Sequence, residues 1–198
     1  MSQLAYAIDQ RLYLNITDRC TLVCAFCPKT LGDHHVKGYD LTLEQRPTAD
    51  EVITAISDPS GYDQVVFCGY GEPTLRLKVL LEVASWVRGF DVPVRVNTDG
   101  LANLAHKRNV LPELSACVNS LSVSMNAQDA EVYARHCQPR LPGAFEAMLD
   151  FLRLAPNHVG DVTATAIDGL DGVDIPACQR LADSLGVKFR KRLLDQVG

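Results

Sequence analysis

Short apolar segments alternate with helical patterns along most of this chain. Six segments have the apolar or alternating character of strands, namely residues 12–16, 64–68, 92–96, 121–125, 161–167 and 187–194. Helical patterns lie between them, at 48–56, 75–88, 129–137, 142–154 and 174–185, with shorter turns interrupted at Pro112 and an exposed loop over 28–47. Such alternation predicts parallel strands joined by right-handed crossovers. Six units are fewer than the eight of a closed barrel, so an α/β fold is expected, either an incomplete barrel or an open doubly wound sheet.

Polar and glycine-rich clusters follow the ends of the predicted strands. They are the cysteine-containing run 20–27, Gly69–Pro73, Asn97–Gly100, Ser124–Asn126 and Asp168–Gly169. In either architecture, ligands bind beyond the carboxyl ends of parallel strands. The sequence therefore predicts one binding site at that edge of the sheet.

Three cysteines, Cys20, Cys24 and Cys27, occupy the first of these clusters with the spacing Cys-x3-Cys-x2-Cys. Three thiolates on a short loop can ligate three of the four irons of an iron–sulfur cubane. The neighbouring sequence supplies no fourth cysteine, so one iron would stay open to a ligand from outside the protein. Two alternatives remain: scattered buried cysteines, or a Cys3His zinc knuckle that uses His34 or His35.

The next two clusters offer groups for a polar ligand. In Gly69-Tyr-Gly-Glu72-Pro73, we expect the glycines to let the backbone approach a ligand and Glu72 to accept from an ammonium group. The alternative is a Gly/Pro turn with an exposed acid. Asn97 and Asp99 have short side chains with acceptors that suit ribose hydroxyls, although Asp-Gly is also a common β-turn signature.

Together these motifs resemble those of the radical S-adenosylmethionine (SAM) superfamily. The resemblance implies a partial (β/α)6 barrel with parallel strands, in which Cys20, Cys24 and Cys27 hold a [4Fe-4S] cluster. The open iron would bind the amino and carboxylate groups of SAM. The cofactor-binding residues implied by the family motifs are Phe26, Gly71, Glu72, Asn97, Asp99, Ser124, Asn126 and Ile167.

Within this set, Gly71-Glu72 resembles the Gly-Gly-Glu motif that binds the amino group of SAM, with Tyr70 in place of the first glycine. Asn97, Asp99, Ser124 and Asn126 would contact the ribose. Ile167, in the nearest equivalent of the family's adenine-contacting stretch, and Phe26, just before the third cysteine, would lie beside the adenine. For Phe26 a place in the core is the alternative.

The resemblance also implies a mechanism. An external one-electron donor such as flavodoxin or ferredoxin would reduce the cluster, SAM would be cleaved, and the 5′-deoxyadenosyl radical would take a hydrogen atom from a substrate that the sequence does not identify. The runs Tyr13–Cys20, Gly69–Leu75 and Val96–Gly100 resemble the small TatD-associated members more closely. Alternatives are a compact nucleobase or deazaguanine-type radical SAM enzyme and a zinc-binding interaction module without turnover.

Composition and charge limit the class of protein and the cellular compartment to be expected. A formal charge of -5 does not favour a general nucleic-acid binder, no apolar window is long enough for a membrane span, and the first residues lack a signal-peptide pattern. Seven cysteines, an odd number, indicate a reduced cytoplasmic chain. We expect a single domain over 1–198, with Cys68, Cys117, Cys137 and Cys178 mostly in the core. Arg190 or Arg192 of the last strand is expected to point into the cleft, with a solvated outward face for at least one of them.

Overall fold

The computed structural model describes residues 2–194 and contains one large, mostly parallel sheet. Its strand order is β1-β2-β5-β6-β7-β8-β9, and β3 and β4 form a separate hairpin. The strands are β1 Ala5–Ile8, β2 Arg11–Leu14, β3 His35–Val36, β4 Tyr39–Asp40, β5 Gln64–Phe67, β6 Val94–Thr98, β7 Ser120–Ser124, β8 Asp161–Asp168 and β9 Lys188–Leu193. The helices are α1 Ala49–Ile56, α2 Leu77–Arg88, α3 Ala102–His106, α4 Leu111–Ser115, α5 Ala130–Cys137, α6 Ala144–Leu154 and α7 Ile175–Ser184, with 3-10 turns η1 Pro73–Arg76 and η2 Ala155–Asn157.

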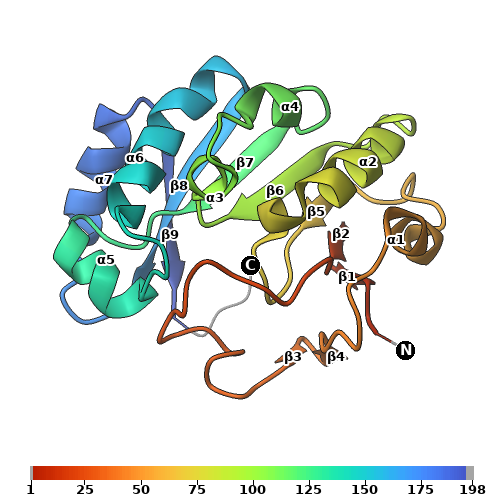
Figure 1. Ribbon diagram of the computed structural model, residues 1–198, viewed down its shortest axis with the longest axis horizontal. Helices are drawn as coiled ribbons and strands as arrows, with labels where there is room; N and C mark the ends of the chain where they lie inside the picture. Colours follow the sequence, from red (N-terminus) through yellow and green to blue (C-terminus); the bar gives the residue numbers. More distant parts are fainter. Residues whose placement is uncertain (1, 195–198) are drawn as a thin grey trace.

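The order of the strands decides between the two expected architectures. From β2 to β9, each parallel strand pairs with the next strand of the sheet along the chain, without the reversal that defines a doubly wound sheet. Figure 1 shows the helices gathered along one side of the sheet. Successive right-handed crossovers in one direction give this arrangement. The predicted partial barrel of six parallel strands is confirmed, and the antiparallel β1 adds an edge strand that was not predicted.

Side chains alternate between two faces of the sheet. On β6, for example, Val94 and Val96 belong to the main core beneath the helices, so Arg95 and Asn97 start on the opposite face, which we call the inner face. Near β1, β2 and β5 a second apolar cluster of Tyr6, Tyr13, Leu41, Val66 and Tyr70 covers the inner face. Polar side chains occupy it toward β6–β9.

Several local predictions are confirmed. Helix α1 begins with a capping box in which the Glu51 N–H donates to Thr48 Oγ1 and the Thr48 N–H donates to Glu51 Oε2, at 3.2 and 2.7 Å. Asp174 caps α7. Pro112 differs from expectation: it lies in the first turn of α4, where no N–H partner is needed, and so begins a helix that it was expected to interrupt.

The N-terminal third contains strands that were not predicted. The β3–β4 hairpin lies within 28–47, predicted to be loop, and each of its strands has two residues, too few to form an alternating pattern. None of the helices in the described part of the chain is both long and apolar enough to cross a membrane.

Candidate functional site

The cysteine loop follows β2 at the carboxyl end of the parallel strands, as predicted. Its three cysteines are half-buried, and Cys20 and Cys24 pack against the main core. The end of α5 holds the loop through its backbone: Val23 N–H donates to the Cys137 carbonyl (3.1 Å), and Ala25 N–H donates to the His136 carbonyl (2.9 Å). The loop is therefore fixed in place by a segment more than a hundred residues away in the sequence. No side-chain pattern could indicate this role, because the contacts are made by backbone atoms.

A fourth cysteine lies beside the loop in space. Cys137 is completely buried, as expected of a core residue, and its thiol hydrogen-bonds with that of Cys24. This hydrogen bond, together with burial, raises the pKa of the Cys24 thiol. Burial, reinforced by nearby carboxyl groups of Asp99 and Glu72, raises the pKa of Cys20. The contact between Cys24 and Cys137 was not predicted.

The histidines proposed as zinc ligands have other partners. The His34 ring packs edge-on against Tyr70, with ring centroids 5.8 Å apart, and His35 lies 3.4 Å from Asp33. Within residues 2–194, no three His, Cys, Asp or Glu side chains are gathered as ligands of a single ion. A cubane differs from a single ion in its demands, because each thiolate binds a different iron and the sulfur atoms need not converge on one point.

The glycines of the 69–72 turn lie against the protein's own chain. A Cβ at Gly71 would be 2.4 Å from the Thr17 carbonyl oxygen and 2.5 Å from that of Arg19, and a Cβ at Gly69 would be 2.3 Å from Asn15 Oδ1. We expected these glycines to let the backbone approach a ligand. The structure shows that the approach is instead to the start of the cysteine loop, so Gly71 positions the turn against that loop.

The carboxylate of Glu72 is buried, 3% exposed, where we expected it to face a cleft. Oε1 accepts from the Thr74 N–H (3.0 Å), the Thr74 hydroxyl (2.5 Å) and the Thr98 hydroxyl (2.8 Å), and Oε2 accepts from the Asp99 N–H (2.7 Å). Burial and the nearby Asp99 raise the pKa of Glu72, against the effect of these hydrogen bonds. Glu72 therefore ties the end of β5 to the end of β6, an arrangement that excludes the alternative of an exposed acid in a turn.

Asp99 continues the same network toward the cysteines. Its side chain accepts from the hydroxyl of Thr21, the residue after Cys20, and from the Leu101 N–H at 2.9 Å. Burial raises the pKa of Asp99. In the structure both of its carboxylate oxygens accept hydrogen bonds from the protein. Glu72 and Asp99 thus form a buried support beneath the cysteine loop.

Replacing Glu72 by glutamine tests this support. Each carboxylate oxygen of Glu72 faces a backbone N–H, that of Thr74 or that of Asp99, so either orientation of the amide places its NH2 against a donor that cannot turn away. We expect Glu72→Gln to lower the free energy of unfolding by about 1–3 kcal/mol in urea titrations, the cost of an unsatisfied buried polar group. The control Glu82→Gln, on the exposed side of α2, should stay within about 0.5 kcal/mol of the parent. Equal losses in both variants would contradict the role given to Glu72.

The other predicted site residues differ in whether their side chains are already engaged by the protein. Asn97 is half-buried on the inner face, and its Oδ1 is buried without a hydrogen-bond partner. Ser124, half-buried at the end of β7, and Ile167 of β8 lie on that face too. Asn126 is instead engaged by the protein, since its Oδ1 accepts from Arg192 Nη2 at 3.1 Å and its Nδ2 donates to Cys137 Sγ at 3.7 Å. Phe26 packs partly buried against the main core, as in the alternative given for it.

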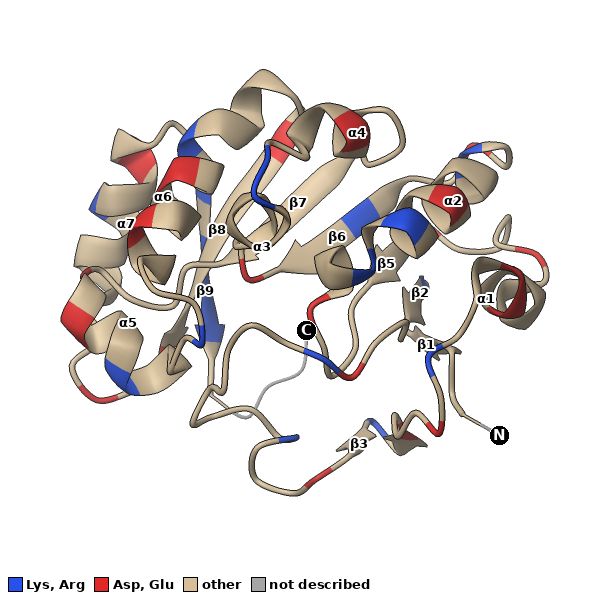
Figure 2. Ribbon diagram, in the orientation of Figure 1, with Lys and Arg blue, Asp and Glu red and all other residues tan. Residues whose placement is uncertain are grey.

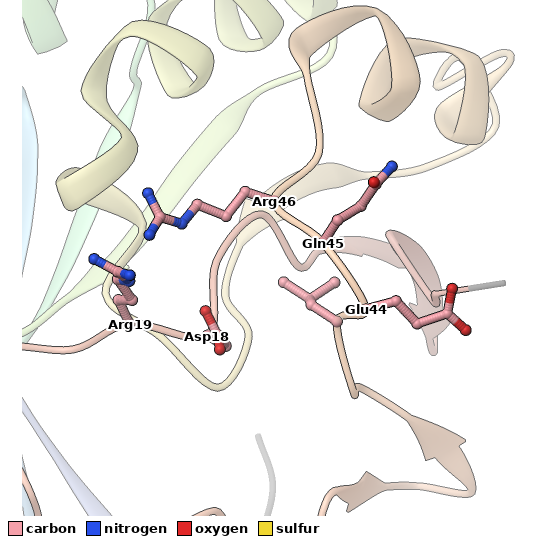
Figure 3. Close-up of a pocket in the computed structure, with 6 residues that line it drawn as sticks. Asp18, Arg19, Glu44, Gln45 and Arg46 are labelled. Atoms are coloured by element: carbon pink, nitrogen blue, oxygen red, sulfur yellow. The ribbon is translucent and has the colours of Figure 1, made fainter.

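A pocket of about 240 Å3 lies next to the start of the cysteine loop. It is lined by Asp18, Arg19, Leu43, Glu44, Gln45 and Arg46. Figure 3 shows the side chains of Arg19 and Arg46 extending toward the same side of it. None of the predicted site residues lines this pocket.

Comparison with known proteins places the chain in a family. A family model described as the Radical SAM superfamily matches residues 14–185, whereas no curated protein matches. The fold is similar to that of TYW1 with a lysine-pyruvate adduct bound (TM-score 0.67, 14% identity, 95% of this chain and 66% of that one). It is also similar to Streptococcus suis SuiB bound to precursor peptide SuiA (TM-score 0.70, 13% identity, 96% of this chain and 40% of that one). A third similar structure is methylornithine synthase PylB (TM-score 0.58, 17% identity, 93% of this chain and 53% of that one).

These identities show a shared fold, and the chain spans less than two thirds of the length of SuiB and PylB and about two thirds of that of TYW1. The family match, which covers most of the chain, carries the assignment. The chain belongs to the radical SAM superfamily of enzymes.

Proposed function

We propose that this chain, as a single domain over 1–198, binds a [4Fe-4S] cluster through Cys20, Cys24 and Cys27 and uses it to cleave SAM reductively, with hydrogen abstraction from a substrate. The observation that carries this proposal is the placement of three half-buried thiols on one loop at the carboxyl end of the sheet. Membership of the superfamily supports both cofactors.

The residues around the loop fit a cluster. Backbone hydrogen bonds to the end of α5 and a hydrogen bond from Thr21 to Asp99 fix the loop that carries the thiols. A cluster site needs ligands held in advance and an apolar surrounding that limits access of water. Leu22 is buried and Phe26 packs against the core, so the chain supplies such a surrounding.

The inner face fits SAM. Asn97 Oδ1, a buried acceptor without a partner, is suited to a ribose hydroxyl, and Ser124 and Ile167 lie on the same face. Every carboxylate oxygen of Glu72 and Asp99 already accepts at least one hydrogen bond from the protein, whereas Asn97 Oδ1 accepts none. We therefore give Asn97 and Ser124 direct contact, and Gly71, Glu72, Asp99 and Asn126 the positioning of the elements around SAM.

The cofactors and the protein would contribute different parts of the reaction. When bound, the cluster and SAM supply one-electron cleavage of the sulfonium and a radical able to take a hydrogen atom from carbon. The chain's own residues bind the cofactors, orient SAM from the inner face and exclude water at the loop. An external donor such as flavodoxin or ferredoxin would provide the electron. The closer resemblance to TatD-associated members and the cytoplasmic location stay predictions.

Anaerobic turnover tests the proposal. Protein reconstituted with iron and sulfide is mixed with SAM and dithionite, and the products are separated by liquid chromatography. We expect 5′-deoxyadenosine and methionine to appear only when reductant is present. A protein that carries its full cluster and forms neither product, or one that retains a single zinc ion in place of iron, would contradict the proposed function.

A further inference from the structure

Toward β6–β9, the inner face carries three arginines opposite the helix-covered core. Arg95 lies on β6 between two valines of that core, so its side chain starts on the inner face. On β9, Phe189 packs against the core, which places Arg190 and Arg192 on the inner face as well. Figure 2 shows Lys and Arg on β6 and along β9. Both β9 arginines start on this face, with Arg190 exposed and Arg192 half-buried.

The three arginines interact electrostatically with one another or with a shared neighbour. Burial lowers the pKa of both Arg95 and Arg192, and Arg190 adds to the lowering in each case. Cys68, on the same face at the end of β5, interacts electrostatically with both Arg95 and Arg192. Arg95, Arg190 and Arg192 therefore lie on one face of the sheet and near enough for Arg190 to affect the other two.

These charges have no carboxylate partner within residues 2–194. Among residues 2–194, Arg95, Arg190 and Arg192 take part in no ion pair, and the only hydrogen bond from any of their side chains is that of Arg192 to Asn126. The Nε atoms of Arg95 and Arg192 are buried without a partner. Lysines of the same strand differ, since Lys188 pairs with Asp161 at 2.8 Å and Lys191 with Asp168 at 3.0 Å. Arg95 and Arg192 are thus each left with an unsatisfied Nε–H donor, and none of the three positive charges is paired with a carboxylate of residues 2–194.

We propose that Arg95, Arg190 and Arg192 bind the anionic group, a carboxylate or a phosphate ester, of this enzyme's substrate. The assignment to the substrate rests on the proposed function; the anion site itself rests on the arginines. A buried cation is costly unless it is paired, and the planar guanidinium binds oxyanions through two parallel hydrogen bonds. Asn97 lies two residues beyond Arg95 along β6, toward the cysteine loop. A substrate anchored at the arginines would lie on the same face of the sheet as Asn97 and Ser124.

Anion binding is measured on the reconstituted protein saturated with SAM, at constant ionic strength set with sodium chloride. Inorganic phosphate and succinate are titrated separately, and the midpoint of thermal unfolding is followed, because a ligand of the native state raises it. We expect at least one of the two anions to raise the midpoint of the wild type. Arg95→Gln and Arg190→Gln should each raise that anion's apparent dissociation constant about tenfold or more, the effect of losing a charge-assisted hydrogen bond. Arg180→Gln, an exposed arginine on α7, is the matched control and should change it less than about twofold.

The outcomes separate the two anion classes and the two proposals. Stabilisation by phosphate alone assigns a phosphate ester, by succinate alone a carboxylate, and by both the shared oxyanion chemistry. Arg95→Gln should also leave the midpoint without ligand unchanged or higher, because it removes an unpaired buried cation; a purely structural arginine would lower it. Failure of both anions to stabilise the wild type, or equal binding by Arg95→Gln and Arg180→Gln, would overturn the anion site. The titration does not depend on SAM cleavage, so its failure is distinct from that of the proposed function.

Discussion

Replacing any one of Cys20, Cys24 and Cys27 by alanine is expected to remove most of the bound iron and to abolish the reductive cleavage of SAM. Each thiolate would bind a different iron, and the loop offers no spare ligand among its other side chains. Iron and acid-labile sulfide per chain, the visible absorption of the cluster, and 5′-deoxyadenosine formation are measured for each variant. We expect loss of at least about 100-fold in product formation, the upper end of what loss of a supporting ligand contact costs in metal sites.

Two controls make this result specific. Cys178→Ala removes a buried thiol on α7, away from the loop, and should keep iron and activity. Cys137 is a second control, because its buried thiol hydrogen-bonds with that of Cys24. If Cys24→Ala kept iron and the double variant Cys24→Ala/Cys137→Ala lost it, Cys137 would be an alternative ligand. Full iron and activity in all three single variants would exclude the triplet as the cluster site.

Alanine at Gly71 is expected to destabilise the protein strongly. Its Cβ would lie 2.4, 2.5 and 2.8 Å from backbone atoms of Thr17 and Arg19, which cannot move without shifting the start of the cysteine loop. We expect a loss of about 3 kcal/mol in the free energy of unfolding, the upper part of the range for overpacking. Urea unfolding measures this, and iron content reports the accompanying displacement of the loop.

A glycine elsewhere provides the comparison. A Cβ at Gly160 would meet no atom within 4 Å, and this glycine does not need the left-handed backbone region, so Gly160→Ala should change stability by no more than about 0.5 kcal/mol. Similar stabilities for the Gly71 and Gly160 variants would show that the turn does not pack closely against the loop, and the role given to Gly71 would be wrong.

The parts of this protein that local patterns control were predictable from sequence. Helix α1 begins at its capping box, and the alternation of strands with helices predicts a parallel sheet with its binding edge at the carboxyl ends. The cysteine spacing and the polar clusters at the strand ends led to the superfamily that the family match confirms.

What the sequence did not reveal depends on partners far apart along the chain. Glu72 is buried because its acceptors meet Thr98 and Asp99, and no local pattern shows that these residues will come together. Gly71 is required by the backbone of Thr17 and Arg19, which belong to another strand's end. The contact between Cys24 and Cys137 likewise depends on how α5 packs. Motifs therefore predicted the edge of the sheet where these residues gather, whereas tertiary contacts decide which of them are hydrogen-bonded within the protein.

The decisive measurement is electron–nuclear double resonance of the reduced cluster with SAM carrying 15N in its amino group. If three cysteines hold the cubane, the fourth iron is free to bind that nitrogen, and we predict a resolved 15N hyperfine coupling that disappears when unlabelled SAM is used. A cluster spectrum without 15N coupling at saturating SAM, as four protein ligands would give, would contradict the assignment of an open iron in this chain.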